Sequence, residues 1–499
     1  MVSRWLVATH RWLGILLGAL LVAWFLSGFV MLWHGMPALS AAERLERLPP
    51  LDLEAARVEP AAAAARAGVD ARALRVGTLS SRPVYRFGAG RGTTTVFADD
   101  GAVFRGMGRV DAAEIAGRHL GAPVDPHSHR RLDEPDQWTL QSRALLPMHR
   151  FALGDSAGRV VYVSDRTGEV VLVTDRASRR WGLLGPVVHW VYFTPLRRHS
   201  SLWLQGMIWV SAAGVLLTAS GLAWGVWVFV RRRRTPYRGW LRWHHVAGLS
   251  FGAVSLAWVL SGLLSLDPWS WHPGTTPAPE QVRAVRGGDL DLEAVTLERL
   301  RAARDALARV DPPRELEVGR FLGDHFALAG SRRAPAGRLV AWLDRPPNAP
   351  APPGDLGDLV AAARRALPES EPIAVDWLER GDAYYHDRPY AGAGRRALPV
   401  LRVRFDDRAA TALYLDALTG VLVHREQRAT RINRWLYHGL HSWDHPALIA
   451  RPALRRALMV AFLVGGLTSA ASAAAPGCRR LGGLIARRAR SGARPKSPW

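Results

Sequence analysis

Four stretches of the chain are apolar and nearly free of charge. A helix that crosses a bilayer needs about 20 such residues. The fourth stretch is short and rich in alanine, so its hydropathy is the weakest. The pattern therefore predicts four transmembrane helices, over residues 12–33, 202–230, 244–266 and 457–475.

Two long polar connections join these helices in pairs, over residues 35–180 and 267–430. The first begins with an alanine- and glutamate-rich segment, Pro37 to Arg66, which favours helix. Short β-branched runs then alternate with tight turns such as Thr167-Gly168 and Thr419-Gly420, which is typical of β-hairpins. Each connection is thus predicted to form an α+β domain of its own, and residues 346–354 read as a proline-rich linker.

The two halves of the chain resemble each other. Nine of the twenty residues that start at His10 are identical to those that start at His244, at an offset of 234. Farther along, an ungapped offset of 252 relates His189 to His441 and the helix that follows each. The sequence therefore predicts a parallel internal duplication, in which each copy has a helix, a polar domain, an interfacial segment and a second helix.

Basic residues predict the orientation in the membrane. The net charge is +23, but the basic clusters adjoin the helices, which argues against nucleic acid and favours lipid headgroups as partners. Six arginines lie between Arg231 and Trp243, and seven arginines or lysines follow Cys478. The positive-inside rule places both segments and both termini in the cytoplasm and the two polar domains outside. The first apolar run is longer than the 7–15 residues of a signal-peptide core, so we expect it to be retained.

Composition narrows the chemistry. The single cysteine excludes covalent c-type haem, iron–sulfur clusters and cysteine-based zinc sites. Motifs of zinc proteases, serine hydrolases and phosphate-binding loops are missing, as are nicotinamide and flavin fingerprints. Any redox cofactor must therefore be held by other side chains, and the electron donor must be another molecule.

The seventeen histidines are the best candidate ligands. The duplication pairs His10 with His244 at the cytoplasmic ends of helices, and His189 with His441 at the opposite ends. Axial imidazoles in an apolar slot are what b-type haem requires, and glycines one turn away would let a flat macrocycle approach the backbone. These four residues are the predicted haem-iron ligands, with His245 and His438 as substitutes.

The other histidines rank lower. His34 and His272 form the next pair to consider, at the outer ends of their helices, and His445 could serve the outer site. His127 and His129 could hold a surface metal ion or lie in a solvated loop. We expect four further histidines to be ordinary surface residues, namely His199, His325, His386 and His424.

Several motifs resemble the PepSY-associated transmembrane family. They are His10-Arg-Trp-Leu-Gly14, the Ser-Gly helix ends at Ser27 and Ser261, and Trp435-Leu-Tyr-His-Gly-Leu-His441. The two hairpins around Thr-Gly are similar to the end of a PepSY module. This resemblance implies an inner-membrane protein with four helices and periplasmic PepSY-like domains, a link to iron uptake and, in some members, di-haem reduction of ferric siderophores.

The sequence thus predicts a haem-b membrane oxidoreductase with two haems. It would pass electrons from an unknown donor to a periplasmic acceptor, which we expect to be a ferric siderophore or other ferric chelate. The alternative is a non-enzymatic PepSY protein that binds a protein or peptide, or an accessory subunit in metal uptake. The predicted segments are 1–34 (start and first helix), 35–180 (first domain), 181–230 (interfacial histidine and second helix), 231–243 (arginine-rich loop), 244–266 (third helix), 267–430 (second domain), 431–476 (interfacial histidine and fourth helix) and 477–499 (basic tail).

Overall fold

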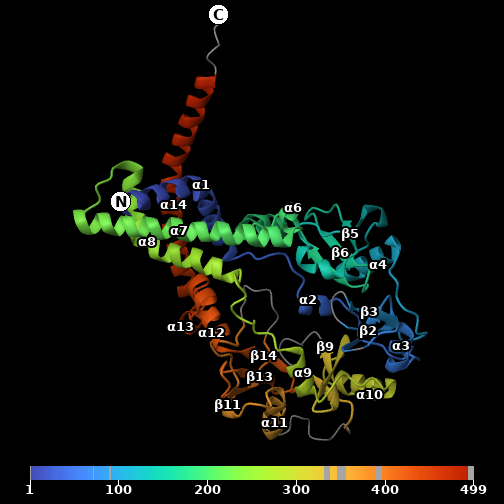
Figure 1. Cartoon of the computed structure of the whole chain (residues 1–499). Coiled ribbons are helices and arrows are strands. Elements are labelled where there is room, and N and C mark those ends of the chain that lie inside the picture. The colour runs from blue at the N-terminus through green and yellow to red at the C-terminus, as the bar shows by residue number, and fades with distance from the viewer. Residues whose placement is uncertain are drawn as a thin grey trace, which may run out of the picture. The chain divides into compact units, whose positions relative to one another are not determined.

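A computed structural model of the chain describes residues 2–70, 72–88, 92–330, 338–345, 356–387 and 396–492. The side chains of residues 2, 3 and 474–492 are outside this description, as is the predicted linker at 346–354. The chain divides into two compact units (Figure 1). The helical unit consists of residues 1–36, 181–273 and 432–499, and the sheet unit consists of residues 37–180 and 274–431.

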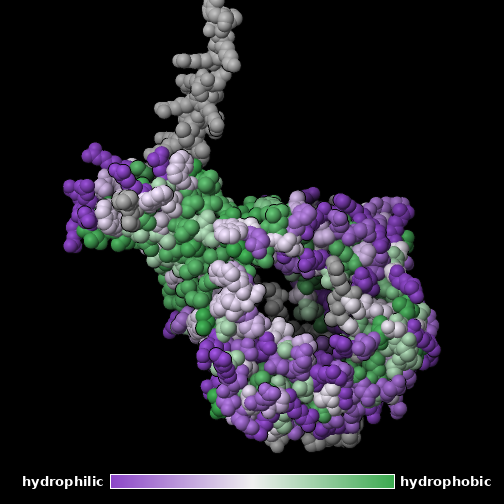
Figure 2. Space-filling view, viewed as in Figure 1, coloured by the Kyte–Doolittle hydropathy of each residue, from purple (hydrophilic) through white to green (hydrophobic). Residues whose placement is uncertain are grey.

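Four long helices build the helical unit, and each contains an apolar stretch long enough to cross a membrane. Helix α1 contacts α7 and α14, and α8 contacts the same two helices. Apolar residues from all four, among them Leu21, Leu217, Val259 and Leu463, form a common core. Figure 2 shows the hydrophobic surface that these helices carry. The helices are α1 (Val2–Met31), α7 (Ser200–Arg232), α8 (Gly239–Ser265) and α14 (Pro452–Gly492).

The helices extend beyond the predicted ranges at their polar ends. The first begins at Val2 instead of residue 12, and the fourth begins at Pro452 and continues past the apolar stretch. Arginine has a high helix propensity and tryptophan an intermediate one, so the arginines and tryptophans at these ends allow the helix to continue after the apolar run stops. Short helices lead into α7 and α14, namely α5 (Arg176–Gly182), η4 (Leu183–Val187), α6 (Thr194–Arg197), α12 (Arg428–Arg434), η5 (Trp435–Gly439) and α13 (Pro446–Ile449).

A six-stranded antiparallel sheet lies at the centre of the sheet unit, in the order β10-β9-β8-β1-β2-β3. Its strands are β1 (Leu74–Leu79), β2 (Arg82–Phe87), β3 (Thr94–Phe97), β8 (Glu315–Phe321), β9 (Asp324–Gly330) and β10 (Val340–Trp342). Apolar residues of this sheet share one core with helices α3 (Pro60–Ala67) and α10 (Leu297–Ala308).

Each polar connection also forms a four-stranded sheet of its own. The orders are β4-β5-β6-β7 and β11-β12-β13-β14, and α4 (Arg109–Leu120) and α11 (Leu356–Ala366) pack on them. The strands are β4 (His129–Leu132), β5 (Met148–Ala152), β6 (Val160–Ser164), β7 (Val170–Thr174), β11 (Pro372–Leu378), β12 (Val400–Phe405), β13 (Ala412–Asp416) and β14 (Leu422–Glu426). The remaining short helices are α2 (Ala41–Glu46), η2 (Pro126–Ser128), η3 (Leu140–Leu145) and α9 (Pro279–Arg286).

The two polar connections do not fold separately, which differs from the prediction of one domain each. Strand β1 of the first pairs with β8 of the second, with Leu74 opposite Val318 and Val76 opposite Leu316. Three strands leave an open edge, and pairing the two edges satisfies their backbone groups. The predicted hairpins at Thr167 and at Thr419 are present as β6–β7 and β13–β14.

Two other predictions for the polar connections are wrong. The segment Pro37 to Arg66 is not helical throughout: it forms only the short helices α2 and α3, and Pro49-Pro50 lies between them, where a helix would lose its hydrogen bonds. His325 and His424 are buried instead of exposed. Each bonds a carboxylate through one ring nitrogen, His325 to Asp344 at 2.8 Å and His424 to Glu426 at 2.9 Å, so a buried polar atom of each ring has a partner within the protein.

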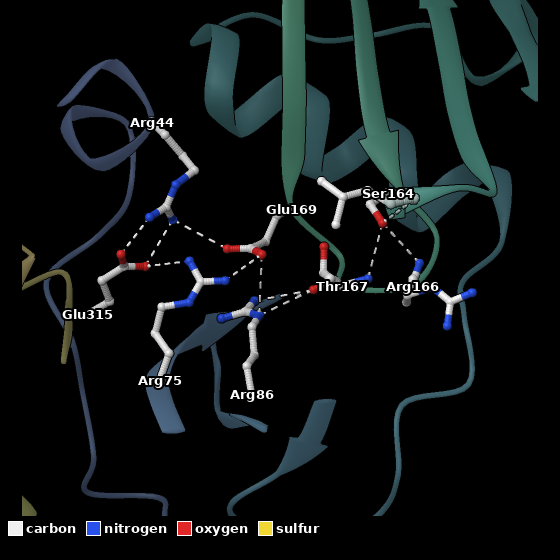
Figure 3. A network of polar contacts seen from close by, with 9 residues as sticks. Arg44, Arg75, Arg86, Ser164, Arg166, Thr167, Glu169 and Glu315 are labelled. Carbon is white, nitrogen blue, oxygen red and sulfur yellow. Dashed lines mark hydrogen bonds and ion pairs between the residues drawn. The ribbon is translucent and has the colours of Figure 1, made fainter. Parts of the chain in front are cut away.

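A network of charged side chains joins α2 and the β6–β7 turn to strands β1, β2 and β8 in the sheet unit (Figure 3). Glu169, in the β6–β7 turn, accepts hydrogen bonds from Arg44 at 3.3 Å and Arg75 at 2.8 Å, and Arg86 lies 3.7 Å away. Arg44 and Arg75 also bond Glu315. Burial by itself would raise the pKa of Glu169, but the three guanidinium groups outweigh it and lower this pKa to about 2.

Candidate functional site

His10 and His244 face each other where α1 and α8 begin, close to the arginine-rich α7–α8 loop. Their ring centroids are 5.8 Å apart, and the ring planes make an angle of 26°. In each ring Nδ1 lies within hydrogen-bonding distance of a backbone carbonyl, 3.0 Å from Leu217 for His10 and 2.9 Å from Ser469 for His244. An Nδ1–H that donates to a carbonyl leaves Nε2 as the lone-pair nitrogen, which is the arrangement of a metal-binding imidazole.

A glycine of α7 makes room for the His10 ring. A Cβ atom added to Gly221 would lie 2.3 Å from Cε1 and 2.5 Å from Nδ1 of His10. Real Cβ atoms do not come so close to ring atoms, so any larger residue would displace the imidazole. Gly221 is therefore part of the site, although the sequence analysis did not single it out.

His189 and His441 face each other at the opposite ends of the helices. Their ring centroids are 6.0 Å apart, with an angle of 71° between the planes. Nδ1 of His189 lies 3.1 Å from the hydroxyl of Ser27, and Nδ1 of His441 lies 3.0 Å from that of Ser261. These are the serines of the two Ser-Gly helix ends.

The local structure explains why both outer histidines point into the helical unit. Each follows a single π-helical turn, η4 or η5, in which the extra residue rotates the chain before the next helix. The glycines after the two serines keep the rings close to the helices. A Cβ atom on Gly28 would lie 3.5 Å from Cε1 of His189, and one on Gly262 would lie 3.8 Å from Cε1 of His441.

The contacts of the two pairs match each other at the offsets found in the sequence. Residues of α1 and α8 differ by 234, as in Ser27 and Ser261. Residues of the interfacial segments, α7 and α14 differ by 252, as in the Leu217 and Ser469 carbonyls. Each of the four hydrogen bonds therefore has an equivalent in the other half of the chain, so that the setting of His10 matches that of His244 and the setting of His189 matches that of His441.

Two tryptophans lie one turn before the outer serines, on the same helices. The indole Nε1 atoms of Trp24 and Trp258 are buried and have no hydrogen-bond partner in the described part of the chain. A buried donor without a partner costs about 1–3 kcal/mol. The backbone carbonyls of both residues, in contrast, accept bonds from Ser27 and Ser261.

The substitute ligands lie beside the two pairs. Nε2 of His245 lies 3.2 Å from the Gly225 carbonyl, so this ring is turned toward α7. The ring of His438 packs on Tyr437, with centroids 4.4 Å apart. Sequence position alone could not distinguish these rings from those of His244 and His441.

The lower-ranked candidates have other surroundings. His34 stacks on Trp181 at 4.7 Å, His272 lies 3.6 Å from Asp267, and His445 caps the start of α13. In the sheet unit, His129 bonds His149 at 2.9 Å. No group of three or more His, Cys, Asp or Glu that could hold a metal ion occurs among the residues that the structure describes.

One family of known proteins matches the chain. The family described as the PepSY-associated TM region matches residues 7–342 of the 499, which include three of the four long helices and three of the four paired histidines. None of the curated proteins compared matches the chain. The match covers well over half of the sequence, and the protein is a member of the PepSY-associated TM family.

Proposed function

We propose that the protein is a haem-b oxidoreductase of the bacterial inner membrane that passes electrons to a periplasmic ferric chelate, such as a ferric siderophore. The observation that carries this proposal is the presence of two facing imidazole pairs at opposite ends of one apolar helical unit. One pair near each surface is what electron transfer through the membrane requires, because a single centre would leave most of the bilayer to be crossed.

The donor set fits haem iron. Imidazole nitrogens bind transition metals at about 2 Å, so two rings on opposite sides of one metal ion have centroids about 6 Å apart. The observed separations are 5.8 and 6.0 Å. The bonds from Nδ1 to carbonyl and hydroxyl groups would orient each ring and raise its basicity, as the outer-shell partners of metal ligands do.

The surroundings of the rings fit as well. Gly221, Gly28 and Gly262 leave space beside three of the four imidazoles. The unpaired indole N–H groups of Trp24 and Trp258 could donate to a polar group of a bound molecule.

His10 and His244 would hold the inner haem, and His189 and His441 the outer one. A bound haem supplies an iron ion that cycles between the ferric and ferrous states. The side chains of the chain would fix the ring orientations, and the apolar core around Leu21, Leu217 and Leu463 would exclude water between the two sites. We further propose that the two halves arose by duplication and that the arginine-rich end faces the cytoplasm, which leaves the sheet unit in the periplasm.

Proteoliposomes test this function. A reduced dye is trapped inside, a membrane-impermeant ferric chelate is added outside, and external ferrous iron is measured with a colorimetric chelator. We expect ferrous iron to form with the wild-type protein and to fall to the level of protein-free liposomes with His10→Ala or His441→Ala. A wild-type rate equal to that of protein-free liposomes would contradict the proposal and favour a non-enzymatic PepSY protein.

A further inference from the structure

A hollow of about 320 Å³ opens on the helical unit at its arginine-rich end. One wall is the first three turns of α1, and the other is an indole of α7. The hollow is distinct from the His10 site, since at 100° per residue Arg4 and Arg11 lie about 100° or more around α1 from His10. Its lining residues are Arg4, Val7, Ala8, Arg11, Trp12 and Trp224.

The two arginines of this hollow have no acidic partner within the helical unit. Residues 1–36, 181–273 and 432–499 contain only two carboxylate side chains, Asp267 and Asp444. Asp267 follows the last residues of α8, and Asp444 precedes α14 and lies 3.8 Å from Arg434. Both are thus at the opposite ends of the helices, so the helical unit supplies no carboxylate near Arg4 and Arg11.

The wall formed by α7 is held in place. The indole of Trp224 stacks on Trp227, with centroids 4.8 Å apart, and its Nε1 donates to the hydroxyl of Tyr237 at 3.2 Å. Arg231 lies over Trp227 at 4.8 Å. On the other wall Ala8 is small, so the hollow stays open between the two arginines, whose Cα atoms are about 10 Å apart along the helix.

Exposed tryptophans surround this end of the unit. Trp5 is 74% exposed, Trp12 54%, Trp240 57% and Trp243 63%. Such indoles collect where a membrane protein meets the headgroup layer. We therefore expect the hollow to lie at the depth of the lipid phosphates, with the apolar surface of α1 and α7 deeper in the membrane, where acyl chains would run.

We propose that this hollow is a binding site for the headgroup of an anionic phospholipid. The guanidinium groups of Arg4 and Arg11 bind the phosphate oxygens, for which their planar donor geometry is suited. Val7 and Trp224 flank the glycerol backbone, and Trp12, which lies deeper along α1, contacts the start of an acyl chain. A basic hollow between membrane helices is the usual form of such sites. This inference does not depend on the presence of haem.

Native mass spectrometry of the purified full-length protein tests the site. The protein is titrated with phosphatidylglycerol and, separately, with phosphatidylcholine of the same acyl chains. We expect saturable binding of the first lipid and much weaker binding of the second. Arg4→Gln/Arg11→Gln should weaken phosphatidylglycerol binding by about tenfold or more, since both substitutions remove charge-assisted hydrogen bonds to the phosphate.

Two further variants separate a site from general surface charge. Arg232→Gln/Arg234→Gln removes the same charge from exposed positions outside the hollow and should leave the affinity unchanged. Ala8→Phe keeps both arginines and fills the hollow, and it should weaken binding as strongly as loss of the arginines. If both arginine pairs weaken binding equally, or if Ala8→Phe binds like the wild type, the proposed site is wrong. Displacement of the lipid by millimolar inorganic phosphate would instead identify a free-anion site and also overturn it.

Discussion

The four histidines of the two facing pairs share one chemical setting. Each has Nδ1 within about 3 Å of an oxygen, from a carbonyl for His10 and His244 and from a serine hydroxyl for His189 and His441. The buried His325 and His424 of the sheet unit differ, since each bonds a carboxylate. A neutral oxygen at Nδ1 orients the ring and leaves Nε2 for a metal ion.

Single histidine variants test the ligand assignment. We expect His10→Ala to remove the inner haem or convert it to a high-spin form, and His441→Ala to do so only for the outer haem. His245→Ala and His438→Ala serve as neighbouring controls and should keep two low-spin haems. Absorption spectra of the oxidised and reduced proteins check this. Full haem content with an unchanged spectrum in all four paired variants would refute the assignment, and His34 and His272 would be tested next.

Glu169 carries a pH-dependent part of the stability of the sheet unit. Its pKa is lowered from 4.5 to about 2, which corresponds to about 3 kcal/mol. Because the folded-state pKa is lowered, this stabilisation is complete above pH 4.5 and is lost as the pH falls toward 2. We expect Glu169→Gln to lower the free energy of unfolding at pH 7 by about 3 kcal/mol and to flatten its decline between pH 4.5 and 2. Pulse proteolysis of the full-length protein measures both effects.

A matched control separates this network from ordinary surface pairs. Glu114 forms an exposed pair with Arg118 at the i,i+4 spacing, and such pairs contribute about 0.5 kcal/mol or less. Glu114→Gln should therefore change the free energy of unfolding by less than about 0.5 kcal/mol. Equal effects of the two substitutions would show that Glu169 has no special role.

At the scale of elements, the packing of α7 on α1 depends on one close approach. A Cβ atom on Gly221 would lie 2.3 Å from the His10 ring. Gly221→Ala should therefore displace this ring, lower the content of the inner haem and destabilise the helical unit by about 1–3 kcal/mol. Gly206→Ala on the same helix has open space around the new atom and should be neutral or slightly stabilising. Haem spectra and thermal unfolding in detergent check both variants, and equal behaviour of the two would contradict the packing argument.

Sequence periodicity predicts some elements better than others. The four long helices and the two Thr-Gly hairpins follow from local patterns, since an apolar run or an alternation across a turn is sufficient to specify them. The pairing of β1 with β8 joins residues about 240 positions apart, and no local pattern contains that information. The burial of His325 and His424 likewise depends on packing against residues elsewhere in the chain, Asp344 for His325 and Tyr385 for His424. The facing of His10 with His244 could be predicted, because repetition within the chain marked both residues.

At the scale of the whole molecule, the distribution of charge predicts one orientation. Reporter fusions at the N-terminus, after Arg234 and at the C-terminus should all report the cytoplasm, because arginines flank these positions. Insertions after Ser156 and after Asp311, in the sheet unit, should report the periplasm. A reporter after Arg234 that is active on the periplasmic side would reverse the proposed direction of electron flow.

The central claim is that the helical unit holds two non-covalent haems. The absorption spectrum of the purified wild-type protein, with haem quantified as its pyridine complex, tests it most directly. We expect a Soret band, two haem b per chain, low-spin spectra in both redox states and complete extraction of the haem into acidified organic solvent. A protein purified from haem-replete cells that shows no Soret band, or that keeps its haem on the denatured chain, would contradict the account.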